Sequence, residues 1–131
     1  MAEQRDRPHA NSNFVVEFGS GASRSGRTGF AEVVFAPFTI AETPAGRLVL
    51  RRGVTGALDL YAWWDQARRD KAPPRRVMNV KLLAGDHATV VWTWRFRGVR
   101  PVSLSYSPLR GVDGGILMET IELAYDDVEM A

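Results

Sequence analysis

The fold is decided by residues 50–76, LRRGVTGALDLYAWWDQARRDKAPPRR, which hold the one convincing helical pattern in a chain that otherwise favours strands. Apolar residues recur there at Leu60, Trp63, Trp64 and Ala67, the spacing that lines one face of an α-helix. Pro73 and Pro74 prevent the helix from continuing. We therefore predict one amphipathic helix at about residues 57–71, with Leu60, Trp63 and Trp64 facing the core.

A two-residue alternation is clearest in residues 89–97, where apolar side chains alternate with Thr93, Arg95 and Arg97. This period gives a sheet one dry face and one wet face. The turn at residues 84–87 predicts a hairpin with a strand at 76–83. Further strands are predicted at residues 13–18, 30–38, 47–52, 101–107 and 116–125. Six or seven strands with one covering helix predict a mainly β fold, either a small β-sandwich or an open barrel.

The length of 131 residues fits one domain that can bury a core without disulfides or metals. We expect this domain at residues 13–131, after a flexible arm at residues 1–12 that shows no periodicity. The glycine-rich residues 19–29 favour a flexible connection, because they lack the residue order of a phosphate-binding loop. With no apolar leader and no run of ~20 apolar residues, we expect a protein made in the cytoplasm without a membrane anchor.

Charge is distributed unevenly, although the net charge is only +2. Residues 68–100 carry nine basic and two acidic side chains, whereas residues 113–131 carry six acidic side chains and no basic one. Such asymmetry is typical of a nucleic-acid surface or of self-association between opposite patches, and it also occurs on solvated strand faces. All three interpretations stay open at this point.

Chemistry-bearing residues are few. Cysteine is absent, which excludes disulfides and cysteine-ligated zinc. His9 falls in the predicted arm and His87 in a predicted turn, so neither joins a triad or a ligand cluster. Asp126 and Asp127 are adjacent, and in a strand they point to opposite faces. The sequence therefore predicts no catalytic residue, no metal site and no cofactor.

Two further features allow more than one interpretation. Glu119 shares a strand face with Leu117 and Ile121, which predicts a buried acid, an acid paired with an arginine, or part of a subunit contact. Four tryptophans beside nine basic residues could stack the bases of a single-stranded nucleic acid. Their positions in the helix stripe and on the apolar strand face favour core packing instead.

Several blocks in order resemble the tail tube protein family of contractile phage tails and of extracellular contractile injection systems. The blocks are NFVVEF at 13–18, GFAEV at 29–33, LRRGVTGALDLYAWWDQAR at 50–68, WRFRGVRPVSLSYSPL at 94–109 and METIELAYDDVEM at 118–130. The block at 50–68 and the last one, 94–109 leading into 118–130, are specific, and the resemblance covers most of residues 13–130.

This resemblance implies a non-enzymatic β subunit that forms hexameric rings, stacked head to tail into a hollow tube inside a sheath. It also implies baseplate, spike and tail-terminator proteins as partners, and DNA or an effector protein as cargo in the lumen. On this basis Thr93, Arg95 and Arg97 are predicted to face the lumen. The residues predicted for ring stacking or the subunit interface are Glu119, Glu122, Asp126, Asp127, Arg75 and Arg76.

One segment departs from the family pattern. Where the family usually carries a long charged hairpin, this chain has only VFAPFTIAETPAGRLV at residues 34–49. A shorter segment has less chain to reach a neighbouring ring, so stacking would depend on contacts between the acidic end and the basic segment. The alternatives are therefore a tube-initiator or terminal ring protein of the same system, or a monomeric nucleic-acid-binding β domain.

Overall fold

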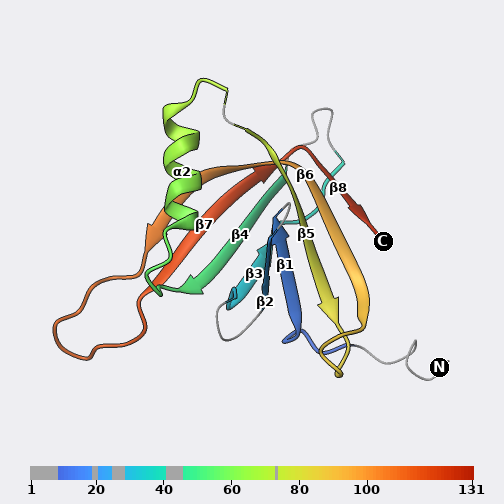
Figure 1. Ribbon diagram of the computed structural model, residues 1–131, viewed down its shortest axis with the longest axis horizontal. Helices are drawn as coiled ribbons and strands as arrows, with labels where there is room; N and C mark the ends of the chain where they lie inside the picture. Colours follow the sequence, from blue (N-terminus) through green and yellow to red (C-terminus); the bar gives the residue numbers. More distant parts are fainter. Residues whose placement is uncertain (1–8, 19–20, 25–28, 41–45, 73) are drawn as a thin grey trace.

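A computed structural model describes residues 9–18, 21–24, 29–40, 46–72 and 74–131 (Figure 1). Its elements are eight strands and one helix in this part of the chain. The strands are β1 (Phe14–Phe18), β2 (Gly21–Arg24), β3 (Glu32–Phe35), β4 (Gly46–Gly53), β5 (Arg76–Leu83), β6 (Val90–Tyr106), β7 (Met118–Tyr125) and β8 (Asp127–Met130), and the helix is α2 (Asp59–Arg69). The prediction of a mainly β fold with one helix is confirmed.

All strand pairs in the sheet are antiparallel, in the order β2-β1-β5-β6-β7-β4-β3, and β8 pairs with β6 beside this path. The long strand β6 pairs with β5 and β8 along its first half and with β7 along its second half. The sequence predicted two separate strands here. They form one strand because Gly98, with φ of 69°, and a register shift between Pro101 and Ser103 turn the chain without ending it.

The core lies between the two halves of the sheet and the helix. Alternate residues of β4 and of the first parts of β5 and β7 point into it, as the two-residue period requires, whereas β6 buries Thr93, Phe96 and Val99. Its fully buried side chains are Phe30, Phe96, Leu48, Leu50, Met78, Ile121, Leu123, Val16, Val80 and Val99. The predicted hairpin of β5 with β6 is confirmed, and it contributes Met78, Val80 and Phe96 to this cluster.

Helix α2 packs beside β6 and closes one side of the core (Figure 1). Leu60 and Trp63 are buried, and the Trp63 ring lies 5.2 Å from the ring of Phe18 on β1. Trp64 is a correction, because it is half-buried and carries the guanidinium of Arg68 over its ring at 4.8 Å. Its side chain lies on the side of the helix, whereas the prediction placed it in the core. In the described part of the chain, no helix is long and apolar enough to cross a membrane.

Three other expectations are corrected. Strand β2 occupies Gly21–Arg24, inside the stretch predicted as a flexible connection, because it pairs with β1. Strand β8, which was not predicted, follows β7 after a one-residue bend at Asp126 and lies beside the seven-strand path of the sheet. Trp92 was predicted on the dry face and is 46% exposed. The first eight residues of the predicted arm, and residues 41–45 of the shortened segment, lie outside the described residues.

The position of Leu60 leads to a stability prediction. Its side chain is 2% exposed, so Leu60→Ala removes buried methyl groups and leaves a cavity under the helix. We expect a loss of about 2–5 kcal/mol in the free energy of unfolding, measured by chemical denaturation. Leu58→Ala is the matched control, because Leu58 is 69% exposed and its truncation should change stability by less than about 0.5 kcal/mol. Equal midpoints for the two variants would contradict the placement of the helix.

Candidate assembly surfaces

A charge cluster, with Arg52 and Glu119 buried and Asp59 exposed, joins the helix to the sheet. The Arg52 side chain on β4 is only 6% exposed. Its Nε donates a hydrogen bond to Glu119 Oε1 on β7 at 2.5 Å. It also forms an ion pair with Asp59, the first residue of α2, and lies 5.4 Å from the ring centroid of Phe30. Arg52 and Glu119 are direct neighbours in the strand register. One cation therefore connects two strands and the start of the helix.

The same cluster sets the electrostatics at the start of the helix. The hydrogen bond from Arg52 lowers the pKa of the Asp59 carboxyl below its ordinary value. Asp59 replaces a side-chain cap, because the helix begins after Leu58 without a side-chain hydrogen bond to its first turn. Of the alternatives for Glu119, the arginine partner is the one observed. Glu119 is 4% exposed, so in the single subunit it lies in the interior and not on a stacking surface.

A second set of charges lies along the pair of β6 and β8. Arg97 donates to Glu129 at 2.6 Å and lies 3.7 Å from Asp127, while Arg95 lies 3.7 Å from Glu129. The backbone of Thr93 exchanges two hydrogen bonds with Ala131. Of the residues predicted for the lumen, Arg95 and Arg97 are therefore exposed on one face, whereas Thr93 is only 9% exposed.

The bend between β7 and β8 carries a third set. Asp126 accepts a hydrogen bond from Arg100 at 2.9 Å and forms an ion pair with Arg75. The hydrogen bond from Arg100 is the main cause that lowers the pKa of Asp126. Gly98 is required beside it, because a Cβ there would stand 2.2 Å from Asp126 Oδ2.

These pairs change the interpretation of the charge asymmetry. The acidic end and the basic segment, which are separate in the sequence, meet within one subunit along β5, β6 and β8. Glu122 also has a partner in the same chain, Arg47 at 3.5 Å, and Arg76 lies over the Trp63 ring at 4.6 Å. The predicted stacking residues are therefore already paired or covered inside the subunit, and their role between subunits stays a prediction.

An apolar hollow opens between β3 and the strands β1, β5 and β6. It has a volume of about 730 Å³. Its walls are mostly aromatic and aliphatic, formed by Phe14, Phe30, Val33, Phe35, Val80, Leu82 and Trp94. Glu32, Ala31, Asn11 and Ser12 lie among the remaining lining residues. We call this hollow the β1–β3 groove.

Reactive chemistry is not assembled around these surfaces. Among the described residues, no three histidine or acidic side chains lie close enough to hold a metal ion. His87 occupies the turn between β5 and β6, with a φ of 61°. The acid Asp86 in the same turn accepts hydrogen bonds from Thr89, which lower the pKa of its carboxyl to about 2. These hydrogen bonds stabilise the turn that connects the two strands of the hairpin.

Sequence reasoning missed Arg52, although a signal was present. Arg52 has the same parity as Leu48 and Leu50 on β4, so the two-residue period places it on the buried face. Glu119 has the same parity as Ile121 and Leu123 on β7. An arginine on the buried face of one strand and a glutamate on the buried face of another are expected to pair, because each buried charge needs an opposite charge. The helix residue Asp59 completes the pair.

The fold and its surfaces define a class of protein, a structural subunit built for assembly. The family model of the T4-like virus tail tube protein gp19 matches residues 12–129. The chain therefore belongs to this family, and it is a structural tail tube component of a phage tail or contractile injection particle, not an enzyme. The resemblance derived from the sequence blocks is confirmed.

Solved structures show the same fold at low sequence identity. A chain of the PVC sheath-tube complex, from an extracellular contractile injection system in the extended state, matches with a TM-score of 0.76 and 16% identity, covering 100% of this chain and 97% of that one. A chain of the PVC sheath/tube terminator matches with a TM-score of 0.80 and 19% identity, over 96% and 98% of the two chains. Hcp1 from Flavobacterium johnsoniae matches with a TM-score of 0.60 and 14% identity, over 91% and 94%. No curated protein gave a match.

The buried cluster generates a prediction about stability. Arg52→Met leaves the Glu119 carboxylate buried without its cation, so we expect a loss of about 3–5 kcal/mol in the free energy of unfolding. Arg52→Met combined with Glu119→Leu removes both charges and should recover most of that loss, because apolar replacement of a buried ion pair is often neutral. Denaturant titration of the single and double variants measures both effects. A double variant less stable than Arg52→Met would contradict the pairing.

Asp59 generates a prediction about pH. Its pKa is lower in the folded chain than in the unfolded chain, so its ion pair stabilises the fold above the unfolded pKa of about 3.9. That contribution is lost as pH falls through the folded pKa. We therefore expect thermal unfolding of the natural chain to lose more stability below pH 4 than that of Asp59→Asn. Asp70→Asn is a control, since Asp70 is exposed and has no ion pair in the described part of the chain.

Proposed function

We propose that this chain is a subunit of the inner tube of a contractile tail or injection system, forming hexameric rings that stack head to tail. The stacked rings enclose a hollow conduit for DNA or protein cargo. Membership of the tail tube family supports this proposal most directly. The relatives in sheath-tube and baseplate structures support the sheath and the baseplate as partners of the same kind of tube.

The observation that carries assembly is an open strand edge. The second half of β6, Arg100–Tyr106, pairs with β7 on one side, and no strand of the described residues pairs with its other side. Val102 and Tyr106 on this stretch are 43% and 51% exposed. Native proteins cover or interrupt such edges, because unpaired backbone groups template further pairing. Helix α2 packs beside β6, and a neighbouring subunit supplies the remaining cover of the edge in a ring.

The exposed charged surfaces fit two further roles, lining the lumen and making contacts between rings. Arg95 and Arg97, with their partners on β8, form a mixed-charge surface that can line a water-filled channel without a strong field of one sign. Thr93 contributes through its backbone alone. The other charged set, which contains Arg75, Asp126 and Asp127, lies at the bend between β7 and β8. A contact between rings there would replace ion pairs within the subunit by ion pairs with the next ring. Exposed pairs of this kind are screened by salt.

A second function within the same class is a tube-initiator or terminal ring protein. The shortened segment at residues 34–49 favours it, as do the matches to chains in the PVC sheath/tube terminator and in the cap of the anti-feeding prophage. A bulk tube subunit would form long regular tubes, whereas a terminal ring would form single rings or short stacks when purified alone.

The proposal leads to one assembly prediction. The purified chain should elute far above its mass of 14.6 kDa, and electron microscopy should show rings with a central channel. Raising sodium chloride from 0.1 M to about 1 M should shorten any stacks and leave the rings intact, because the charged pairs are screened more than apolar contacts. Long tubes in molar salt would contradict the terminal-ring alternative. A monomer that binds single-stranded DNA in a salt-dependent way would contradict both functions.

A further inference from the structure

The loop between β6 and β7 projects from the subunit. Eleven residues, 107–117, join the two strands. A short turn would be enough, because Tyr106 and Glu119, next to the loop, are already direct neighbours in the sheet. Figure 1 shows this loop extending away from the body, on the side of the helix start. A Cβ added at Gly111, Gly114 or Gly115 would meet no atom within 4 Å, so the loop backbone stands clear of the rest of the chain.

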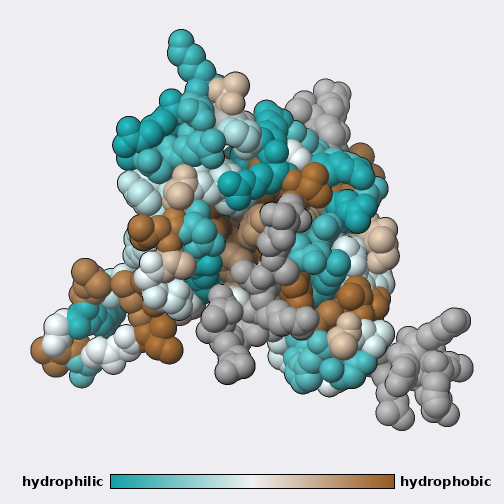
Figure 2. Space-filling view, viewed as in Figure 1, coloured by the Kyte–Doolittle hydropathy of each residue, from teal (hydrophilic) through white to brown (hydrophobic). Residues whose placement is uncertain are grey.

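The loop is apolar where an ordinary surface loop is polar. Leu109, Val112 and Ile116 are 86%, 78% and 79% exposed, and Figure 2 shows hydrophobic surface along the projection. The loop surrounds an open space of about 420 Å³, so these aliphatic side chains do not pack against one another in its interior. Compact loops pack around their own side chains, and this one does not. Exposed aliphatic groups along a projecting loop indicate a contact with another molecule.

A receiver of matching chemistry is present on the same chain. The β1–β3 groove is open to solvent and lined mainly by aromatic and aliphatic side chains. The loop projects away from the strands that form this groove, so one copy of the chain cannot fill its own groove with its own loop (Figure 1). A second copy can do so. Residues 1–8, MAEQRDRP, lie outside the described residues, and their polar composition does not suit the walls of the groove.

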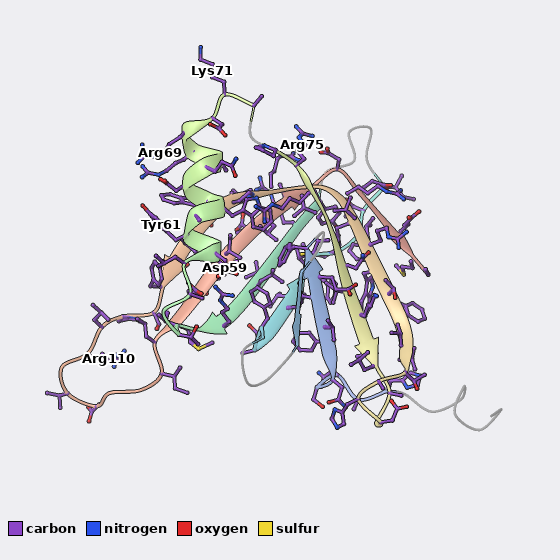
Figure 3. All side chains as sticks on the ribbon, in the orientation of Figure 1. Asp59, Tyr61, Arg69, Lys71, Arg75 and Arg110 are labelled. Carbon is purple, nitrogen blue, oxygen red and sulfur yellow. The ribbon has the colours of Figure 1, made fainter. Side chains whose placement is uncertain are left out.

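Charge complements the apolar fit. Arg110 lies in the projecting loop (Figure 3), and it has no ion-pair partner in the part of the chain that the structure describes. Glu32 lines the β1–β3 groove and is held only by Arg51 at 3.4 Å, with both side chains about half exposed. A weak exposed pair leaves the Glu32 carboxylate available to a second cation.

We propose that the loop of one subunit inserts Leu109, Val112 and Ile116 into the β1–β3 groove of its neighbour around the ring, with Arg110 beside the neighbour's groove carboxylate at position 32. This inference rests on the proposed ring assembly and identifies its apolar contact. The two surfaces differ, so the contact is heterologous, and repeated rotation by the same angle closes it into a ring.

Cysteine cross-linking tests the contact directly, because the natural chain contains no cysteine. Ile116→Cys places a thiol on the β7 side of the loop, near its base, and Ala31→Cys places one on an exposed lining residue of the groove. Mixing the two single variants under mild oxidation should give disulfide-linked dimers. The double variant should give a covalent ladder that ends at the hexamer. Mixing Ile116→Cys with Gln66→Cys, on the exposed face of the helix, is the control and should give monomers.

The outcomes separate this inference from the proposed function. Dimers from Ile116→Cys alone would mean a loop-to-loop contact, and a ladder beyond the hexamer would mean a contact between rings; either result overturns the inference. Rings in the microscope without cross-links from the mixed variants would also overturn it, while the proposed function stands. Cross-linking within a monomer between Ala31→Cys and a cysteine introduced at Glu3 would identify residues 1–8 as the occupant instead. Absence of rings for the natural chain would contradict the proposed function itself.

A charge substitution gives an independent readout. Ile116→Asp should raise the protein concentration at which half of the chains are in rings at least tenfold, measured by analytical ultracentrifugation. Its unfolding midpoint in monomeric conditions should not change, because Ile116 is 79% exposed. Ile40→Asp is the matched control, since Ile40 is fully exposed but lies outside the loop and the groove. Equal effects of the two substitutions on assembly would overturn the inference.

Discussion

The buried guanidinium of Arg52 is the constraint on which the arrangement of helix and sheet depends. A guanidinium stays protonated even when it is buried, so without partners its desolvation would cost the fold several kcal/mol. Glu119 and Asp59 supply those partners from β7 and from the first turn of α2. The helix start is therefore held at one position on the sheet, and Leu60 and Trp63 are then placed over the core. Apolar packing alone would allow the helix to slide.

The long strand β6 provides the second constraint, because it belongs to both halves of the sheet. It can change partners only where its backbone turns, at Gly98 and at the register shift beside Pro101. Proline lacks a backbone donor, which suits a strand whose second half has one open edge. Asp126, Arg100 and Arg75 hold the bend that leads into β8 at the same point. The open edge and the charged surfaces are thus consequences of one turn in one strand.

Much of this fold could be predicted from periodicity, and the remainder depends on tertiary contacts. The alternation at residues 89–97 and the helical spacing after Leu60 each indicate a local structure that the tertiary fold retains. The continuity of β6 could not be predicted, because a glycine followed by a proline is equally typical of a strand end. Strand β8 was missed because two adjacent aspartates favour a solvated end. Periodicity identifies a wet face at Arg95 and Arg97 but cannot say whether that water lies in a lumen or outside a tube.

The pairing of charges within the subunit limits what electrostatics can contribute to assembly. When the acidic end of one copy meets the basic segment of another, one ion pair replaces another. Asp126, for example, would lose its pair with Arg75 or Arg100 and gain an equivalent pair with a cation of the second copy. Such an exchange gains little free energy at exposed positions and fixes mainly orientation. Association must also offset the loss of translational and rotational freedom. The net driving force therefore has to come from apolar surface removed from water, at about 25 cal/mol per Å². In the described chain that surface includes Val102 and Tyr106 on the open edge of β6, and Leu109, Val112 and Ile116 on the loop that follows it.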